Sequence, residues 1–183
     1  RSSNNIQGME DLVKYIYSQG HRKIAYIHGQ EGSSVTRDRL ASFYRTIDEL
    51  GLEIPDTYVR SADYLETKGS AKQTKELLNL EDPPTCIIYP DDTSLIGGRN
   101  VIIEMGLRIP RDISVAGYDG TMISQLLYPK LTTIRQNTEM IGSEAATRLI
   151  GTIEKPRTTL VERVVIEGSL VPGQSVGAIQ PKG

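Results

Sequence analysis

The stretch ISVAGYDG, residues 113–120, starts with apolar residues and ends with an acid followed by glycine. Its apolar part is typical of a short buried strand, so Asp119 stands where the chain leaves the core. A carboxylate there can accept hydrogen bonds from adjacent hydroxyls of a small ligand. It can also cap the helix expected to begin near Thr121. We predict that Asp119 binds ligand hydroxyls and caps that helix when no ligand is present.

Acids also follow two other predicted strands. Asp63 comes after TYVRSA, and Asp91 and Asp92 come after TCIIYP. Ligands of open parallel sheets bind beyond the carboxyl ends of the strands, so these acids are expected at one rim. One of Asp91 and Asp92 is predicted to cap the helix that begins near residue 93, while the other faces the cleft.

Two arginines and a tyrosine are further candidates. Arg37 and Arg39 fall in the first turn of a predicted helix, where a cation opposes the helix dipole. For Arg37 we favour a solvated surface position. Arg39 is predicted to face the cleft, because its fork of donors suits vicinal hydroxyls or a carboxylate. Tyr64 either stacks on the apolar face of a sugar ring or is a partly exposed rim tyrosine.

The elements that position these residues follow from the spacing of apolar side chains. Strands alternate with amphipathic helices up to Asp119, which predicts an α/β fold with a doubly wound parallel sheet covered on both faces. Gly51 and Gly106, in the similar stretches ELGLEIPDTYVRSADY and EMGLRIPRDISVAGYD, are expected to end helices in the left-handed conformation. Strands are expected at residues 23–29, 57–63, 85–90 and 113–119, and helices at 4–19, 67–80 and 93–105, with a further amphipathic helix marked by Leu40, Phe43, Ile47 and Leu50.

The pattern is weaker after residue 130. A helix is expected near 138–150, and the alternation in LVERVVIEGSLV predicts a strand over 160–171. The last residues, PGQSVGAIQPKG, are predicted to form a disordered tail.

Composition excludes several classes of function. The net charge of −2 comes from scattered charges, so the chain lacks the positive stripe that DNA binding requires. Cys86 is the single cysteine, which excludes an internal disulfide, and its apolar context predicts a buried position in a strand. No apolar run approaches the roughly 20 residues of a membrane span.

Catalysis is not expected. Paired carboxylates such as Asp91 and Asp92 hold Mg²⁺ in some phosphoryl-transfer sites, but a phospho-receiver domain has its acid pair after the first strand. There is no nucleophile beside a base, and His21 and His28 are expected to be structural. We therefore predict neither a cofactor nor a metal.

Four stretches carry a resemblance to a known family: GHRKIAYIHG, RDRLASFY, EMGLRIPRDISVAGYDG and LTTIRQ. In this order and spacing they resemble the effector-binding core of the LacI/GalR transcriptional regulators, which is similar to the periplasmic sugar-binding proteins. The resemblance extends to about Val171. It implies the ligand-binding residues Arg39, Asp119, Asp91, Tyr64, Ser34 and Gln136.

The resemblance also implies a homodimer that forms through the helix at 93–105. Because that helix is apolar on more than one face, a fully buried core helix is the alternative. The implied dimer interface consists of Leu95, Ile96, Ile102, Ile103 and Tyr128.

By the same resemblance, residues 4–134 and 160–171 form the C-terminal lobe, 135–159 return to the N-terminal lobe, and 172–183 are a tail. The DNA-binding domain and most of the first lobe would precede this chain, so we expect the fragment alone to bind its effector weakly. The whole protein is expected to be a cytoplasmic repressor that binds a small sugar or polyol, with no membrane contact. The alternative is the sugar-binding receptor of an ABC transporter.

Overall fold

The computed structural model describes residues 4–141 and 162–179. Helices and strands alternate as the sequence predicts, with one short 3-10 turn at Asp56–Tyr58. In chain order the elements are α1 (Asn4–Ser18), β1 (Ile24–His28), α2 (Ser34–Glu49), β2 (Val59–Ser61), α3 (Thr67–Leu78), β3 (Cys86–Ile88), α4 (Asp92–Glu104), β4 (Ser114–Ala116), α5 (Ile123–Leu126), β5 (Thr133–Ile141) and β6 (Glu162–Val171).

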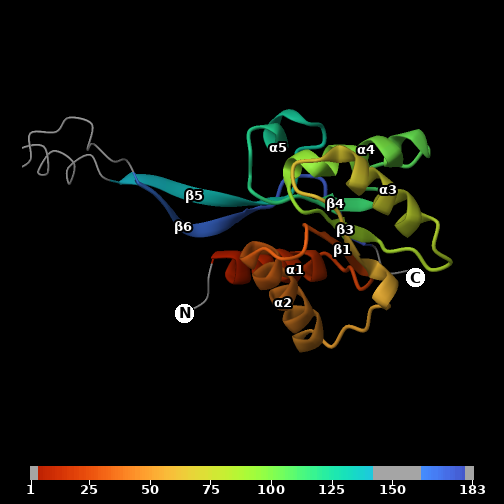
Figure 1. The fold of residues 1–183 in the computed structure, drawn as a ribbon. Coiled ribbons are helices and arrows are strands. Elements are labelled where there is room, and N and C mark those ends of the chain that lie inside the picture. The colour runs from red at the N-terminus through yellow and green to blue at the C-terminus, as the bar shows by residue number, and fades with distance from the viewer. Residues whose placement is uncertain (1–3, 142–161, 180–183) are drawn as a thin grey trace, which may run out of the picture.

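The first four strands form one parallel sheet in the order β2-β1-β3-β4. Helices α1 and α2 cover one face of this sheet and α3 and α4 cover the other (Figure 1). The predicted α/β fold with a parallel sheet is therefore confirmed, and the carboxyl ends of its strands lie along one edge.

Alternation along the central strands divides the core into two apolar layers. In β1, Ile24 and Tyr26 pack with α1 and α2, whereas Ala25 and Ile27 pack with α3 and α4. Cys86 is buried in the first of these layers, as predicted. A parallel strand with helices on both sides is apolar at successive positions, which explains the continuous apolar runs of the sequence.

The two glycines expected to end helices adopt the left-handed conformation. Gly51 follows α2 with φ 70° and Gly106 follows α4 with φ 78°. Their amides donate to the carbonyls of Asp48 and Ile103 in the last turns of those helices. Glycine reaches this conformation without the steric cost of a Cβ atom, so these helices end where the sequence predicts.

After the sheet, the chain forms a two-stranded antiparallel ribbon of β5 and β6, which projects away from the body (Figure 1). The strand predicted over 160–171 is confirmed over 162–171 by β6. The helix predicted near 138–150 is wrong at residues 138–141, where β5 continues because it pairs with β6. Residues 142–150 of that predicted helix lie outside the described part of the chain.

The predicted disordered tail is also wrong over residues 172–179. Ser175 is fully buried and its carbonyl accepts the Val115 amide at 3.0 Å, so the segment covers the free edge of β4. An uncovered strand edge leaves backbone groups unpaired. His21 Nε2 lies 2.8 Å from the Gly177 carbonyl, and burial lowers the pKa of His21 so that the neutral ring fits there. Among the described helices, none has the length and apolar character needed to cross a membrane.

Candidate functional site

Arg39 lies at the centre of the site, where it is only 4% exposed. Its helix, α2, begins at Ser34, because the Ser33 hydroxyl accepts the Thr36 amide as an N-cap. Arg39 therefore lies in the second turn of α2, and its predicted place in the first turn is wrong. The guanidinium lies over the ring of Tyr118, with its carbon 3.7 Å from the ring centroid. Desolvated cation–π contacts of this kind are favourable by about 2 kcal/mol.

The donors of Arg39 reach three separate segments of the chain. Nε donates to Asn5 Oδ1 at 3.0 Å, and Nη1 donates to the Pro90 carbonyl at 3.1 Å. Nη2 forms an ion pair with Asp119 Oδ1 at 3.3 Å. Arg39 therefore joins α1, the loop after β3 and the loop after β4 at the carboxyl edge of the sheet. Its contact with a ligand stays a prediction.

Asp119 adopts a backbone conformation that is unusual for a residue with a Cβ atom. Its φ is 91°, and its side chain is 35% exposed. The prediction that Asp119 caps the following helix is wrong, because the Asp92 carboxylate accepts the Thr121 amide instead. Backbone conformations of this kind cost about 1–3 kcal/mol and concentrate at functional sites.

This strain can be measured with two substitutions. Asp119→Gly and Asp119→Ala both remove the carboxylate, but only alanine retains a Cβ atom in the left-handed region. We expect the glycine variant to be about 1 kcal/mol more stable than the alanine variant, after allowing for the greater freedom of glycine in the unfolded chain. Urea unfolding of the two variants measures the difference. Equal stability would show that Asp119 is not strained.

Of the two adjacent acids, Asp91 is the one that caps helix α4. Its Oδ1 accepts the Ser94 amide at 2.7 Å and its Oδ2 accepts the Leu65 amide at 2.8 Å, and the residue is 1% exposed. The capping role expected for one of the two acids is thereby confirmed. The ligand contact for Asp91 stays a prediction, since both of its oxygens already hold backbone amides.

Asp92 does not face a cleft, and that part of the prediction is wrong. It is fully buried, and its carboxylate accepts the Thr121 amide, the Thr121 hydroxyl and the Thr133 hydroxyl. A Cβ atom on Gly117 would lie 2.1 Å from Asp92 Oδ1, so only glycine fits beside it. Asp92 thus connects the loop after β4 and the start of β5 through these hydrogen bonds.

The burial of Asp92 predicts a pH-dependent stability. Burial raises the pKa of Asp92 from 3.8 to about 6, a rise that the nearby Asp119 charge increases and the threonine hydrogen bonds limit. The folded state binds this proton more tightly than the unfolded chain does. The Asp92 contribution to the free energy of unfolding therefore falls by about 2 kcal/mol as the pH rises from 4 to 6.

Asp92→Asn removes this titration. We expect the stability difference between the wild type and this variant to shrink by that amount between pH 4 and pH 6, as measured by urea unfolding at each pH. The exposed Asp63→Asn variant is the control and should follow the wild type. A difference that does not change with pH would contradict the prediction.

Tyr64 stands at the rim, half-buried. Its hydroxyl lies 2.7 Å from Thr36 Oγ1, and the Arg39 guanidinium carbon lies 6.0 Å from the centroid of its ring. A Cβ atom on Gly29 would lie 2.0 Å from the ring, so this glycine allows the tyrosine to approach β1. Ser34 is exposed at the start of α2. Ligand contacts for Tyr64 and Ser34 stay predictions.

Gln136 is half-buried at the start of the ribbon, and its side chain accepts a hydrogen bond from Asn4 at 2.9 Å. The ligand contact for Gln136 stays a prediction. Sequence reasoning missed Asn4, Asn5 and Tyr118 as members of this region. No local signal in the sequence assigns Asn4 to Gln136, a partner 132 residues away.

The helix proposed for dimer formation divides into a buried and an exposed face. Leu95 and Ile102 are fully buried in the core between the sheet and α4, so assigning them to an interface is wrong. Ile103 is 51% exposed, and Ile96 is half-buried. A 100° turn per residue separates Ile102 from Ile103, and packing on the sheet decides which one is covered.

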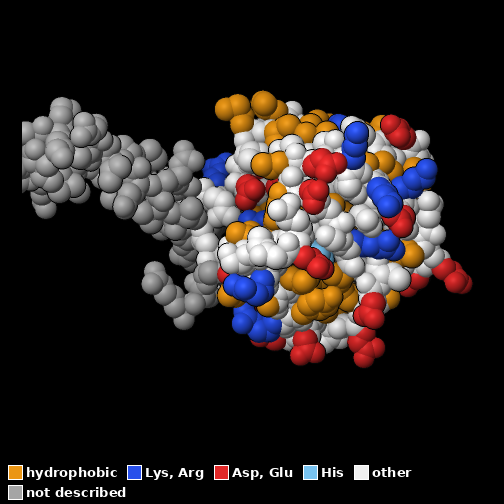
Figure 2. Space-filling model, viewed as in Figure 1, with side chains coloured by type: hydrophobic (Ala, Val, Ile, Leu, Met, Phe, Trp, Pro, Cys, Tyr) orange, Lys and Arg blue, Asp and Glu red, His pale blue; other side chains and the backbone are white. Residues whose placement is uncertain are grey.

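Exposed apolar side chains gather over α4 and α5, at the top of the view in Figure 2. Tyr128 is 83% exposed, and its carbonyl accepts a hydrogen bond from Arg99 of α4 at 3.2 Å. Met122 and Leu126 are 78% and 74% exposed. These residues, together with Ile103, are called the α4–α5 surface below.

The side chains of the site can bind a ligand reversibly through hydrogen bonds. In the described part of the chain, no group of three or more His, Cys, Asp or Glu side chains could hold a metal ion. The polar atoms that reach the edge of the sheet belong to an arginine, a carboxylate and hydroxyl groups. Such groups exchange hydrogen bonds with a polar ligand without forming a covalent bond.

Comparisons with known proteins agree with this geometry. Residues 13–176 match the periplasmic binding protein-like domain. The transcriptional repressor CytR of Escherichia coli is 32% identical over 147 residues, which are 80% of this chain and 43% of CytR. The transcriptional repressor PurR of Aliivibrio salmonicida is 30% identical over 151 residues, 82% of this chain and 45% of PurR. The chain thus spans less than half the length of these relatives.

Solved structures with the same fold include a LacI-family regulatory protein from Chloroflexus aggregans, with a TM-score of 0.75 and 27% identity. That match covers 95% of this chain and 62% of the other. The lac repressor dimer bound to operator and an anti-inducer has a TM-score of 0.74 and 27% identity, covering 95% of this chain and 59% of that one.

The fold is that of an α/β effector-binding lobe. The chain belongs to the periplasmic binding protein-like domain family, in the form found in LacI-family transcriptional repressors. The resemblance inferred from the sequence is therefore confirmed.

Proposed function

We propose that this chain is the effector-sensing and dimerisation domain of a LacI-type transcriptional regulator, and that it binds a small sugar or polyol. The observation that carries the proposal is the Arg39–Asp119 pair at the carboxyl edge of the sheet. The Asp119 carboxylate is partly exposed and can accept hydrogen bonds from two adjacent hydroxyls. Because Arg39 is already desolvated on Tyr118, it holds that carboxylate in place before the ligand arrives.

The other predicted contacts surround this pair. In the proposal, Tyr64 offers its ring to the apolar face of a sugar, and Ser34 adds a hydroxyl. Asp91 and Gln136 complete the proposed wall from the loop after β3 and from the start of the ribbon. The opposite wall belongs to a second lobe, to which residues 135–159 would contribute.

The regulatory part of the proposal rests on the relatives, which are named as repressors. DNA binding would reside in a helix-turn-helix segment outside this chain, in a cytoplasmic protein. Ligand binding would shift a dimer between two arrangements, because the ligand has different affinities for them. The named relatives favour this function over that of a transport receptor.

Ligand binding can be tested on the complete gene product that contains this chain. We expect at least one monosaccharide, polyol or sugar acid to raise its melting temperature, with a gain of about 2.7 kcal/mol at a concentration of 100 Kd. Asp119→Asn keeps the shape of the side chain and should abolish the gain. Asp63→Asn, an exposed acid at the same edge of the sheet, is the matched control and should retain it.

Two outcomes would contradict the ligand assignment. A full gain in the Asp119→Asn variant would place the ligand elsewhere, and a gain with nucleobases alone would exclude the sugar and polyol class. The reading frame upstream of Arg1 tests the regulatory part separately. A helix-turn-helix there supports the regulator, and a signal peptide would establish the transport receptor.

The dimer is proposed to form through the α4–α5 surface, because it exposes apolar side chains on two neighbouring elements. Ile103→Lys should shift sedimentation from dimer to monomer without lowering the melting temperature. Tyr44→Lys is the matched control, since Tyr44 is also about half exposed, at 48%, but lies on α2. A dimer that survives Ile103→Lys, or dissociates in both variants, would contradict this surface.

A further inference from the structure

The β5–β6 ribbon contains a β-bulge close to the body of the protein. Its register passes from Arg135 opposite Ser169 to Asn137 opposite Ile166, so Gln136 faces two residues of β6, one of which is Gly168. Bulges bend a strand pair and increase its twist, and they are common beside functional sites. The direction in which the ribbon leaves the body is therefore set at Gln136 and Gly168.

Asn4, at the start of α1, holds both strands at this bulge. Its Nδ2 donates to Gln136 Oε1 at 2.9 Å, and its Oδ1 accepts the Gly168 amide at 2.6 Å. A Cβ atom on Gly168 would lie 3.2 Å from the Arg135 carbonyl oxygen and 3.2 Å from the Ile134 side chain. Glycine therefore allows the ribbon to come close enough for the Asn4 amide to bond to both strands.

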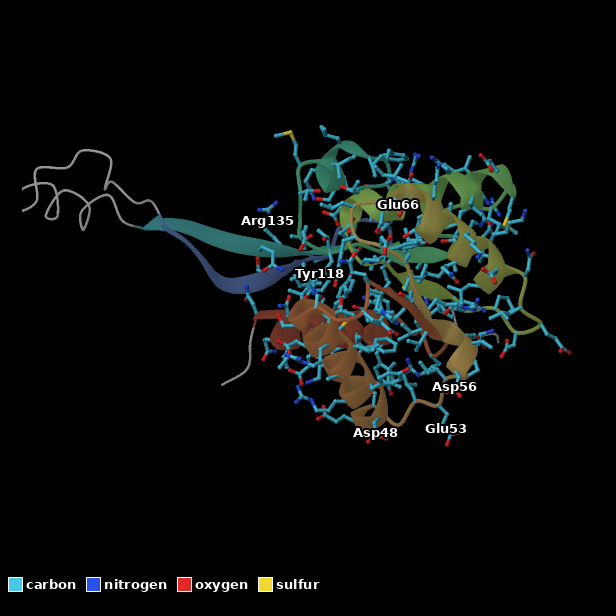
Figure 3. The ribbon with its side chains drawn as sticks, viewed as in Figure 1. Asp48, Glu53, Asp56, Glu66, Tyr118 and Arg135 are labelled. Carbon is cyan, nitrogen blue, oxygen red and sulfur yellow. The ribbon has the colours of Figure 1, made fainter. Side chains whose placement is uncertain are left out.

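The hydrogen bonds of Asn4 to Gln136 and Gly168 are called the clamp below. The next residue of α1, Asn5, connects this clamp to the proposed ligand site. Its Oδ1 accepts the hydrogen bond from Arg39 Nε at 3.0 Å. From the other side, the Gln136 amide donates to the Asp119 carbonyl at 3.3 Å. Figure 3 shows the neighbouring Tyr118 and Arg135 at the base of the ribbon, where it meets the body.

These contacts form a closed circuit. Arg39 is bonded to Asn5 and to Asp119, and both routes end at Gln136, one through Asn4 and one through the Asp119 backbone. Because Arg39 and Asp119 are themselves the proposed ligand-binding pair, a ligand that moves either residue would act on a residue that this circuit links to the ribbon.

We propose that Asn4 is a positioning residue that couples the Arg39–Asp119 site to the direction of the β5–β6 ribbon. This proposal rests on the proposed function only for the reason that the coupling exists, because the contacts themselves are present in the chain without a ligand. A ligand that binds better to one direction of the ribbon would shift the equilibrium toward that direction.

The experiment is amide hydrogen exchange at Gly168 and Gln136, measured by NMR in this chain. Asn4→Ala removes the acceptor of the Gly168 amide and should speed its exchange about tenfold. Asn4→Asp keeps that acceptor and should restore most of the protection at Gly168. If Asn4→Ala left Gly168 unchanged, the clamp would be refuted.

Coupling to the site is tested with Asn5→Ala and Arg39→Met. Each breaks the contact between Arg39 and α1 but leaves Asn4 intact, so faster exchange at Gly168 by severalfold would support the coupling. Arg37→Met, at an exposed position on the same helix, is the control and should have no effect. The amide of Val115 in the core sheet serves as the reference for global unfolding.

An unchanged Gly168 amide in both variants would overturn the coupling. Equal acceleration at Gly168 and Val115 would also overturn it, because the effect would then be global. The measurement requires no ligand, so failure of sugar binding leaves the coupling intact, and failure of the coupling leaves the ligand site intact.

Discussion

Truncation after Val171 is expected to lower the free energy of unfolding by about 5 kcal/mol, the largest effect that we predict. The removed segment contacts the edge of β4 and the end of α1 through the region of Ser175, Gly177 and Ile179. It makes backbone hydrogen bonds from Val115 to Ser175 and from Ile179 to Gln19, at 3.0 and 2.8 Å. Each such bond contributes about 1 kcal/mol, and burial of an apolar side chain contributes about 1.5–3 kcal/mol more.

The side chains of this segment add to that effect. The Ser175 hydroxyl donates to the Val115 carbonyl at 2.5 Å and accepts the Thr132 amide at 2.8 Å. Val176 is 5% exposed in the core. Ser175→Ala alone should therefore cost about 1–3 kcal/mol, because it leaves the buried Thr132 amide without its acceptor. This point variant keeps the prediction measurable if the truncated chain does not fold.

Urea unfolding followed by circular dichroism measures both changes. Deletion of residues 180–183 is the matched control, because it leaves all of these contacts in place. A chain truncated after Val171 that unfolds at the wild-type urea concentration would show that the segment contributes nothing to the stability of the sheet.

Arg39→Met is expected to lower the free energy of unfolding by about 3 kcal/mol. Methionine keeps an apolar stem against Tyr118 but supplies no donor. The Pro90 carbonyl then loses its Arg39 donor in a buried position, and Asn5 and Asp119 lose theirs at partly exposed positions. Loss of a partner at a buried group costs more than at an exposed one, because water cannot replace it.

Two further variants define the cause of this loss. Arg37→Met should change stability by less than about 0.5 kcal/mol, since Arg37 is exposed on the same helix. Arg39→Lys should recover less than half of the loss, because a single ammonium group cannot reach three acceptors in different directions. If lysine restored full stability, charge alone would matter and the fork geometry would be irrelevant.

The sequence by itself determined the parallel sheet and the placement of Arg39 and Asp119 at the same edge of it. Apolar periodicity is a local property, and it distinguishes strands such as 23–29 from amphipathic helices such as 40–50. Parallel strands must present their carboxyl ends at one edge, so the polar residue after each strand is positioned as soon as the topology is known. The left-handed glycines at 51 and 106 follow from local sterics in the same way.

The tertiary structure alone decided which partner each polar or apolar group contacts. Asn4 contacts Gln136 and Gly168, and residues 172–179 pair with β4, across separations that no local pattern encodes. In α4 the sequence is apolar on more than one face, and only packing on the sheet buries Ile102 and exposes Ile103. Burial and hydrogen-bond partners depend on how distant segments pack, which is why these assignments required the folded chain.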